Sequence, residues 1–188
     1  MKKFKVEIQF TTPYLQHRMD DVKLEDWEKN RKQIIERDDV AKPDALRADY
    51  HSYFDDDGYY MPADHLRGSL INAGGMVKSK VGNARKSMKN IVAASFMVPN
   101  DIRIDKWDGI DKRSAVNKHI KARIMVIRPK WNGLKVSFDL LVNNDTITRE
   151  TILEIVQDAG QYIGVGSYRP EHNGMFGQFE VLEFKELK

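Results

Sequence analysis

The sequence contains no cysteine among its 188 residues. This absence excludes disulfide bonds and thiolate metal ligands, and it fits a reducing compartment. There is also no apolar run near the length of a membrane-spanning helix, which needs about 20 residues. The segment that follows Met1 alternates in polarity instead of forming an apolar signal region. We therefore expect a cytoplasmic protein without a signal peptide and without membrane contact.

The composition is that of an ordinary globular protein, with 41% hydrophobic and 31% charged residues. The net charge of +3 conceals an uneven distribution of charge along the chain. Residues 18–57 carry about 13 acids against about 8 bases, whereas residues 65–135 carry about 16 bases against about 4 acids. The middle of the chain can therefore meet a polyanion such as nucleic acid, although the two segments can also neutralise each other in the fold.

The first part of the chain contains a predicted strand followed by a long insertion. Residues 3–11 alternate between apolar and polar side chains, which indicates a half-buried strand that Pro13 ends. Within the insertion, residues 24–37 have the spacing of a helix with one thin apolar stripe. Two aromatic runs flank the turn residues 55–58 and predict a hairpin. Its tyrosines can pack the insertion against the body or stack on bases.

A helix is expected to begin at Pro62, because proline favours the first helical position. Its apolar face is formed by Ala63, Leu66, Leu70 and Ala73, and a pair of glycines closes it. Gly68 lies in the middle of this helix, where glycine costs about 1 kcal/mol relative to alanine. We therefore predict that Gly68 packs closely against a neighbour.

The second half of the chain is predicted to be rich in strands. Residues 93–98 and 102–104 are expected to be extended, and residues 105–118 to form a polar loop or a protruding hairpin. The clearest hairpin covers residues 119–144, where apolar positions alternate on both sides of an Asn-Gly pair typical of a type I′ turn. Thr148 is a candidate N-cap for the next helix. A one-residue phase change in the last strand predicts a bulge.

In chain order these elements are strand, helix, strand, strand, helix and strand. This order predicts an α+β fold of the ferredoxin-like (βαββαβ) class, an antiparallel sheet with two helices on one face. A chain of this length is usually one domain. We therefore expect a single domain over residues 1–188, with large insertions at about 14–60 and 76–118 around the first helix.

The loop between the second helix and the last strand is the most informative stretch. It contains four glycines around Tyr168 and Arg169, namely Gly164, Gly166, Gly174 and Gly177. Glycines permit positive φ and close approach of a backbone to a ligand, and the tyrosine and arginine can contact base and phosphate. The loop is neither a dinucleotide-binding fingerprint nor a P-loop, because it follows a helix and lacks the Gly-Lys-Ser/Thr ending. It either binds a ligand or allows a tight crossing beside the first strand and helix.

A run of basic residues follows the first helix. Its members are Lys78, Lys80, Arg85, Lys86 and Lys89. Cations spaced in this way can track a phosphate backbone, or they can form a solvated surface segment. We expect no cofactor and no metal site.

Three motifs resemble those of the RAMP superfamily, which includes the RNA-binding backbone subunits of CRISPR effector complexes. Thr11-Thr12-Pro13-Tyr14-Leu15 is similar to the family's first strand, which ends in Thr-Pro-Leu. The stretch 60–68 resembles the family's Ile-Pro-Gly-Ser-Ser-Leu-(Arg/Lys)-Gly, with Ala-Asp-His in place of Gly-Ser-Ser. Residues 164–179 resemble its glycine-rich loop, and an uncharacterised phage-encoded group of proteins has a similar Gly-Ser-aromatic-Arg-Pro loop.

The resemblance implies sequence-independent binding of single-stranded nucleic acid, most simply RNA, by a non-enzymatic protein. By position, Arg67, Tyr168, Arg169 and the loop glycines would be the contact residues. A second hypothesis is a phage-encoded interaction or assembly protein that binds a protein partner or assembles with itself. A third is a metal-independent RNA endonuclease in which His65 and His172 act as base and acid, as in processing members of the superfamily.

Overall fold

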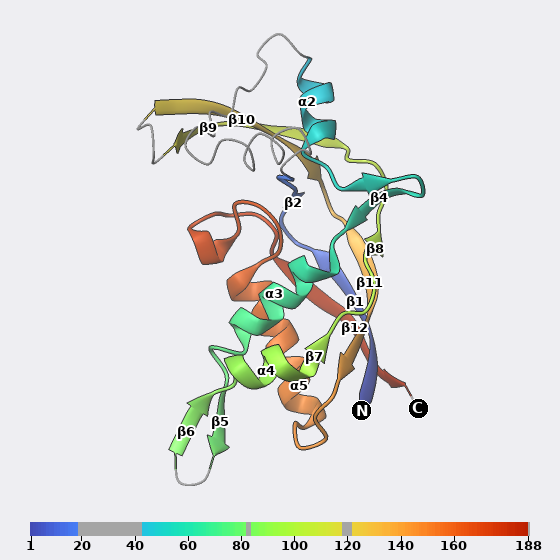
Figure 1. Cartoon of the computed structure of the whole chain (residues 1–188), viewed down its shortest axis with the longest axis vertical. Coiled ribbons are helices and arrows are strands. Elements are labelled where there is room, and N and C mark those ends of the chain that lie inside the picture. The colour runs from blue at the N-terminus through green and yellow to red at the C-terminus, as the bar shows by residue number, and fades with distance from the viewer. Residues whose placement is uncertain (19–42, 82–83, 118–121, 188) are drawn as a thin grey trace, which may run out of the picture.

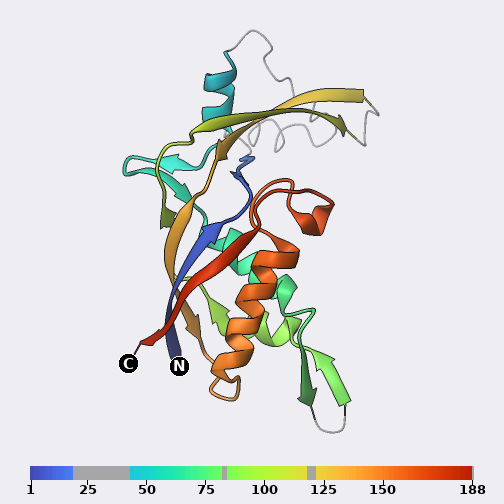
Figure 2. The same cartoon turned by 180° about the vertical axis from the view of Figure 1, so that it is seen from behind.

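The computed structural model describes residues 1–18, 43–81, 84–117 and 122–187. Its body is a four-stranded antiparallel sheet with helices packed on one face (Figures 1 and 2). In spatial order the strands are β12 (Phe179–Leu187), β1 (Lys2–Phe10), β11 (Lys135–Val142) and β7 (Phe96–Met97). All three pairings in this sheet are antiparallel. The described chain is therefore of the α+β class.

The helices on the sheet are α3 (Ala63–Ala73), α4 (Lys89–Ser95) and α5 (Arg149–Asp158), and α5 continues into a π-helical turn (Ala159–Ile163). The predicted cap of α5 is confirmed, because the Thr148 hydroxyl accepts a hydrogen bond from the backbone N–H of Thr151 at 3.2 Å. Alternation in β1 places one side of that strand beneath the helices. The fully buried side chains there include Phe4, Val6, Ile8, Leu66, Leu70, Ile152 and Ile155.

Smaller sheets and a short helix extend from this body. One sheet contains β2 (Tyr14–Leu15), β10 (Ala122–Trp131) and β9 (Gly109–Asn117). A second contains β3 (Phe54–Asp55), β4 (Gly58–Met61) and β8 (Ile102–Arg103). A third is the hairpin of β5 (Lys78–Val81) and β6 (Ala84–Ser87), and helix α2 (Asp44–Tyr50) precedes β3.

The predicted hairpin over residues 119–144 is wrong. β10 pairs with β9 and β2, whereas β11 pairs with β1 and β7, so the chain passes from one sheet to another at residues 132–133. The end of β10 is held on β2 by Trp131. Its ring is buried, and its centroid lies 5.5 Å from that of Tyr14, its pairing partner in β2. Gly133, at φ 57°, allows the change of direction after it.

Other expectations for this part of the chain had mixed outcomes. The hairpin of the two aromatic runs is confirmed as β3–β4. Residues 105–118 were expected to form a polar loop or a hairpin of their own, but residues 109–117 are the single strand β9, which pairs with β10 beyond this stretch. Residues 93–95 were expected to be extended but belong to α4, and only the residues after them enter β7. The helix predicted at 24–37 lies outside the described residues.

The bulge in β12 is confirmed, because the pairing with β1 skips Leu182 between Val181 and Glu183. The close packing predicted for Gly68 is wrong, since a Cβ built there has no heavy atom within 4 Å. The glycine in mid-helix is therefore not explained by a packing contact among the described residues.

Candidate nucleic-acid interface

The glycine loop, residues 164–178, is tied to itself and to the strand that follows β1. At its neck, the backbone N–H of Val165 donates to the carbonyl of Gly177 at 2.8 Å. The N–H of Gly177 donates to Pro13 at 2.9 Å, and the N–H of Ser167 donates to Leu15 at 2.9 Å. The loop is therefore docked on β2 with a defined conformation.

The glycines of this loop are required by close approach and by backbone angle. Gly166 has φ 86°, and a Cβ there would lie 2.6 Å from Cε2 of Tyr14. A Cβ at Gly174 would overlap the carbonyl oxygen of Tyr168, and one at Gly177 would overlap the carbonyl oxygen of Val165. The close packing of the loop against itself and against β2 explains these glycines without a ligand. The same packing fixes the positions of Tyr168 and Arg169 at the tip of the loop.

The two candidate residues at the tip are in different situations. The Arg169 guanidinium folds back on its own loop, donating to Glu171 at 2.6 and 2.9 Å and to the carbonyl of Gly166 at 3.1 Å. Tyr168 is 39% exposed, and its φ of 56° is in the left-handed region. The next turn of the loop is a short 3-10 segment, Pro170–His172.

A residue outside the predicted set, Arg113 of β9, reaches this loop. Its guanidinium carbon lies 4.6 Å from the ring centroid of Phe176 and 5.4 Å from that of Tyr168. Nε of Arg113 donates at 2.5 Å to Asp111, a buried carboxylate that also pairs with Arg128 at 3.5 Å. The sequence predicted only a polar loop or a protruding hairpin at residues 105–118, which does not reveal that Arg113 of β9 contacts the glycine loop.

A buried polar chain lies beside the loop, at the start of α3. Gln16 accepts from the backbone N–H of Tyr53 at 2.8 Å, so its Nε2 is the group that donates to the Tyr14 hydroxyl at 3.2 Å. The Tyr14 hydroxyl also shares a hydrogen bond with Nδ1 of His65 at 3.1 Å. The chain thus links β2 to the start of α3 through Tyr14 and His65.

Burial controls the titration of this chain. It lowers the pKa of His65 below its ordinary value, and the positive charge of Arg169 lowers that pKa further. Burial also raises the pKa of Tyr14. Both groups are therefore neutral at physiological pH. In the described part of the chain, no hydrogen bond joins His65 to His172, whose nearest charged partner is Glu171 at 3.8 Å.

The predicted basic residues divide into two groups. Lys78, Lys86 and Lys89 are exposed on or next to the β5–β6 hairpin. In the same hairpin, Lys80 and Arg85 lie opposite each other in the backbone pairing of the two strands. Arg67 is instead directed at the end of α4, where it donates to the carbonyl of Ala93 at 2.8 Å and to that of Phe96 at 3.3 Å. Arg67 thus caps a helix that has no basic residue of its own in the last turn.

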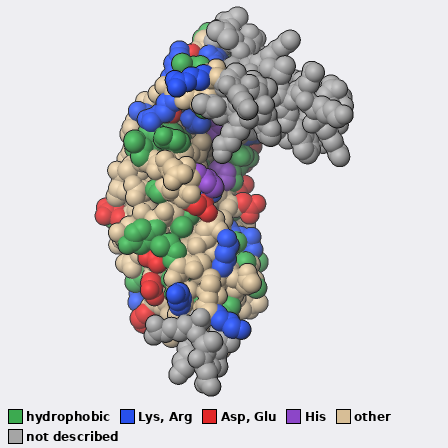
Figure 3. All heavy atoms as spheres, turned by 90° about the vertical axis from the view of Figure 1, so that its left-hand side faces the viewer, with side chains coloured by type: hydrophobic (Ala, Val, Ile, Leu, Met, Phe, Trp, Pro, Cys, Tyr) green, Lys and Arg blue, Asp and Glu red, His purple; other side chains and the backbone are tan. Residues whose placement is uncertain are grey.

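We use "loop face" for the side of the molecule that carries the β5–β6 hairpin, the glycine loop and the β9–β10 ribbon. All three project from the same side, with the glycine loop between the two hairpins (Figures 1 and 2). Figure 3 views this side directly and shows Lys and Arg side chains in its upper and lower parts and histidines near the middle. The exposed cations of the ribbon include Arg123 and also Lys112, which forms an ion pair with Asp44 at 2.9 Å.

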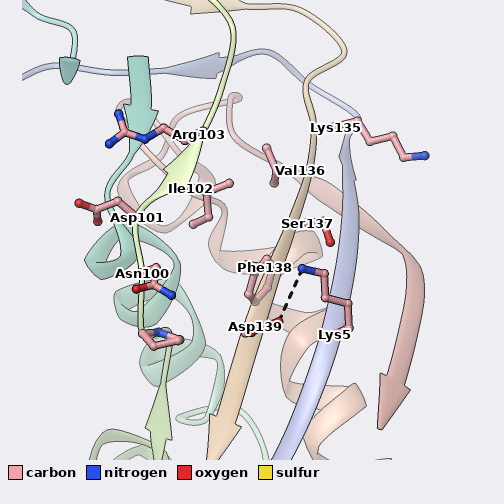
Figure 4. Close-up of a pocket in the computed structure, with 11 residues that line it drawn as sticks. Lys5, Asn100, Asp101, Ile102, Arg103, Lys135, Val136, Ser137, Phe138 and Asp139 are labelled. Carbon is pink, nitrogen blue, oxygen red and sulfur yellow. Dashed lines mark ion pairs between the residues drawn. The ribbon is translucent and has the colours of Figure 1, made fainter. Parts of the chain in front are cut away.

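A groove of about 350 Å³ lies elsewhere, between β11 and the segment 99–103 (Figure 4). The cations that line it are already paired: Lys5 with Asp139 at 3.6 Å, Arg103 with Asp55 at 2.5 Å, and Lys135 with Glu7. Arg103 and Lys135 point away from its centre (Figure 4). The groove therefore lacks the converging charge of an anion site.

The described residues contain no cluster of three or more His, Asp or Glu side chains that could hold a metal ion. Within the same residues, no helix is both long enough and apolar enough to cross a bilayer.

Of the comparisons with known proteins, only the one with solved structures gives matches to this chain. No protein-family model and no curated protein matches it. Among solved structures, a Cas6 product complex is similar over 95% of this chain and 50% of that one, with 13% sequence identity and a TM-score of 0.34. The chain thus spans about half the length of this neighbour. A similarity of this size assigns neither a family nor a function.

Proposed function

We propose that the protein binds single-stranded nucleic acid, RNA in the first instance, along the loop face and without sequence preference. The observation that carries this proposal is the arrangement of two basic hairpins on one side of the molecule, with the glycine loop between them. Cations in this arrangement can follow a phosphate backbone from one hairpin to the other. The uneven charge of the sequence is consistent with it, because both hairpins belong to the basic middle segment.

The fold we propose is ferredoxin-like, of the RAMP type. Support comes from the spatial order β12-β1-β11-β7 and its antiparallel pairings. One helix, α3, follows the first strand of this sheet in the chain, and another, α5, follows the third. Split units of this kind build the ferredoxin-like fold. The β8 and β9–β10 elements then lie in a connection between the second and third strands of the sheet.

Binding would rest on the exposed lysines for affinity and on the glycine loop for position. Lys78, Lys86 and Lys89 have no ion pair among the described residues, so their charge is available to phosphates. Arg67 and Arg169 already donate to protein acceptors, but a guanidinium group has further N–H groups to offer. These two arginines would hold the backbone of the ligand while remaining part of the protein's own structure.

The proposal is tested by fluorescence anisotropy with a labelled single strand of about 16 nucleotides, a site size typical of small binding domains. Lys86→Glu should weaken binding and reduce the salt dependence, because each lost phosphate contact lowers the slope of log K against log salt by about 0.7 for a single strand. Lys185→Glu changes an exposed strand lysine of β12 and serves as the matched control. Equal effects of the two substitutions would contradict a localised interface.

A second candidate, metal-independent RNA cleavage, is favoured by one observation, the buried chain that orients His65. This chain holds the ring of His65 through Nδ1, so Nε2 is the ring nitrogen that would act on a phosphate or a leaving group. Incubation of the protein with labelled RNA in the presence of a chelator tests this candidate. Cleavage that His65→Ala abolishes would support it, and intact RNA would contradict it.

A further inference from the structure

Tyr168 combines an unfavourable backbone conformation with an exposed aromatic ring. Its φ of 56° lies in a region that bulky L-residues rarely adopt. Its side chain is nevertheless 39% exposed. Such conformations cost stability, and they persist where the surrounding structure enforces them, most often at functional sites.

The loop enforces this conformation through several contacts. The carbonyl oxygen of Tyr168 accepts from the N–H of Phe176 at 3.1 Å, and the absence of a side chain at Gly174 makes room for that carbonyl. The next residue, Arg169, is held by Glu171 and by the carbonyl of Gly166. The ring of Tyr168 is thus presented in one place on a rigid loop.

A planar cation from another part of the chain lies beside this ring. The guanidinium carbon of Arg113 is 5.4 Å from the Tyr168 ring centroid, within the range of a cation–π contact. Arg113 is in turn held at 2.5 Å by the buried carboxylate of Asp111. Two flat, partly exposed groups on separate elements are therefore fixed next to each other.

We propose that Tyr168 and Arg113 form a subsite for one unstacked nucleobase of a single strand. The inference rests on the proposed function and adds what the loop recognises, a base instead of a phosphate. The base would stack on the exposed ring, and the guanidinium would extend the platform and donate hydrogen bonds to the edge of the base. A base inside a duplex is already stacked on its neighbours, so the subsite favours single strands.

The test compares Tyr168→Leu with Tyr168→Phe on the full chain, using a 2-aminopurine-labelled single strand and an abasic strand of the same length. Leucine keeps apolar bulk but removes the π face, whereas phenylalanine keeps it. Tyr168→Leu should weaken binding of the base-containing strand about 5- to 150-fold, the range of one base–aromatic stack. It should also remove the 2-aminopurine quenching and leave binding of the abasic strand and its salt slope unchanged. Tyr168→Phe should retain both signals.

Tyr162→Leu is the matched control, because Tyr162 is also exposed, at 48%, but is a residue of the π-helical turn before the loop. Arg113→Lys keeps the charge but loses the plane, and it should weaken the base-containing strand selectively. If Tyr168→Leu weakens both strands equally or neither, the subsite is refuted while binding on the loop face stands. If the native protein binds no single strand at low salt, the proposed function fails instead.

Discussion

Replacement of Gly68 by alanine should stabilise the protein. Gly68 lies in the interior of α3, and a Cβ there would meet no heavy atom within 4 Å, so the new methyl group causes no clash. Alanine is favoured over glycine inside a helix by about 1 kcal/mol. For a protein of this size, that free energy corresponds to an increase in Tm of about 2–4 °C.

The assay is urea and thermal unfolding followed by far-UV circular dichroism, with Gly74→Ala as the control. Gly74 caps the same helix, but its Cβ would lie 2.6 Å from Cγ2 of Val92, so this substitution should lower the free energy of unfolding. Opposite signs for the two glycines are the expected result. A Gly68→Ala protein that is less stable than the native one would refute the reasoning.

The same substitution separates stability from binding. Because no packing contact among the described residues requires Gly68, its place next to Arg67 is explained if the ligand backbone approaches the helix there. Under the proposed function, Gly68→Ala should therefore bind single-stranded RNA more weakly than the native protein while unfolding at a higher temperature. Unchanged affinity would show that Gly68 makes no close contact with the ligand.

Three further changes test the contacts around the site. Arg67→Ala should lower the free energy of unfolding by about 1.5–3 kcal/mol, because two carbonyls at the end of α4 lose a charged donor. Urea unfolding measures this change, and an unchanged midpoint would contradict it. Asp111→Asn should lower the free energy of unfolding by about 1.5–3 kcal/mol in the same assay, since the change weakens a charged acceptor that Arg113 contacts at 2.5 Å and Arg128 at 3.5 Å. Burial lowers the pKa of His65 from 6.5, so below that pH the unfolded chain binds more protons than the folded one. The free energy of unfolding should therefore fall as the pH drops below about 6.5, and His65→Gln should reduce this dependence on pH.

Several elements could be predicted because their signal is local. The alternation of residues 3–11 located β1, Thr148 located the start of α5, and a phase change located the bulge at Leu182. Each of these depends on neighbours within a few residues along the chain. The glycine loop was found for the same reason, because its glycines are close together in the sequence.

The failures come from contacts between distant residues. An Asn-Gly pair between two alternating segments predicts a hairpin, but the contact of Trp131 with Tyr14 draws β10 to another sheet. The position of Arg113 over Tyr168 depends on the same pairing of β10 with β2, since β9 pairs with β10 along its whole length. Composition and spacing along the chain carry no information about either contact.

The central claim is tested most directly by the salt dependence of single-strand binding. Anisotropy titrations of the native protein with single-stranded RNA between about 50 and 200 mM salt should give a linear fall of log K with log salt. Lys78, Lys86 and Lys89 alone predict a slope of roughly −2, at about 0.7 for each neutralised phosphate. An absence of binding at low salt, or an affinity that salt does not change, would contradict the account.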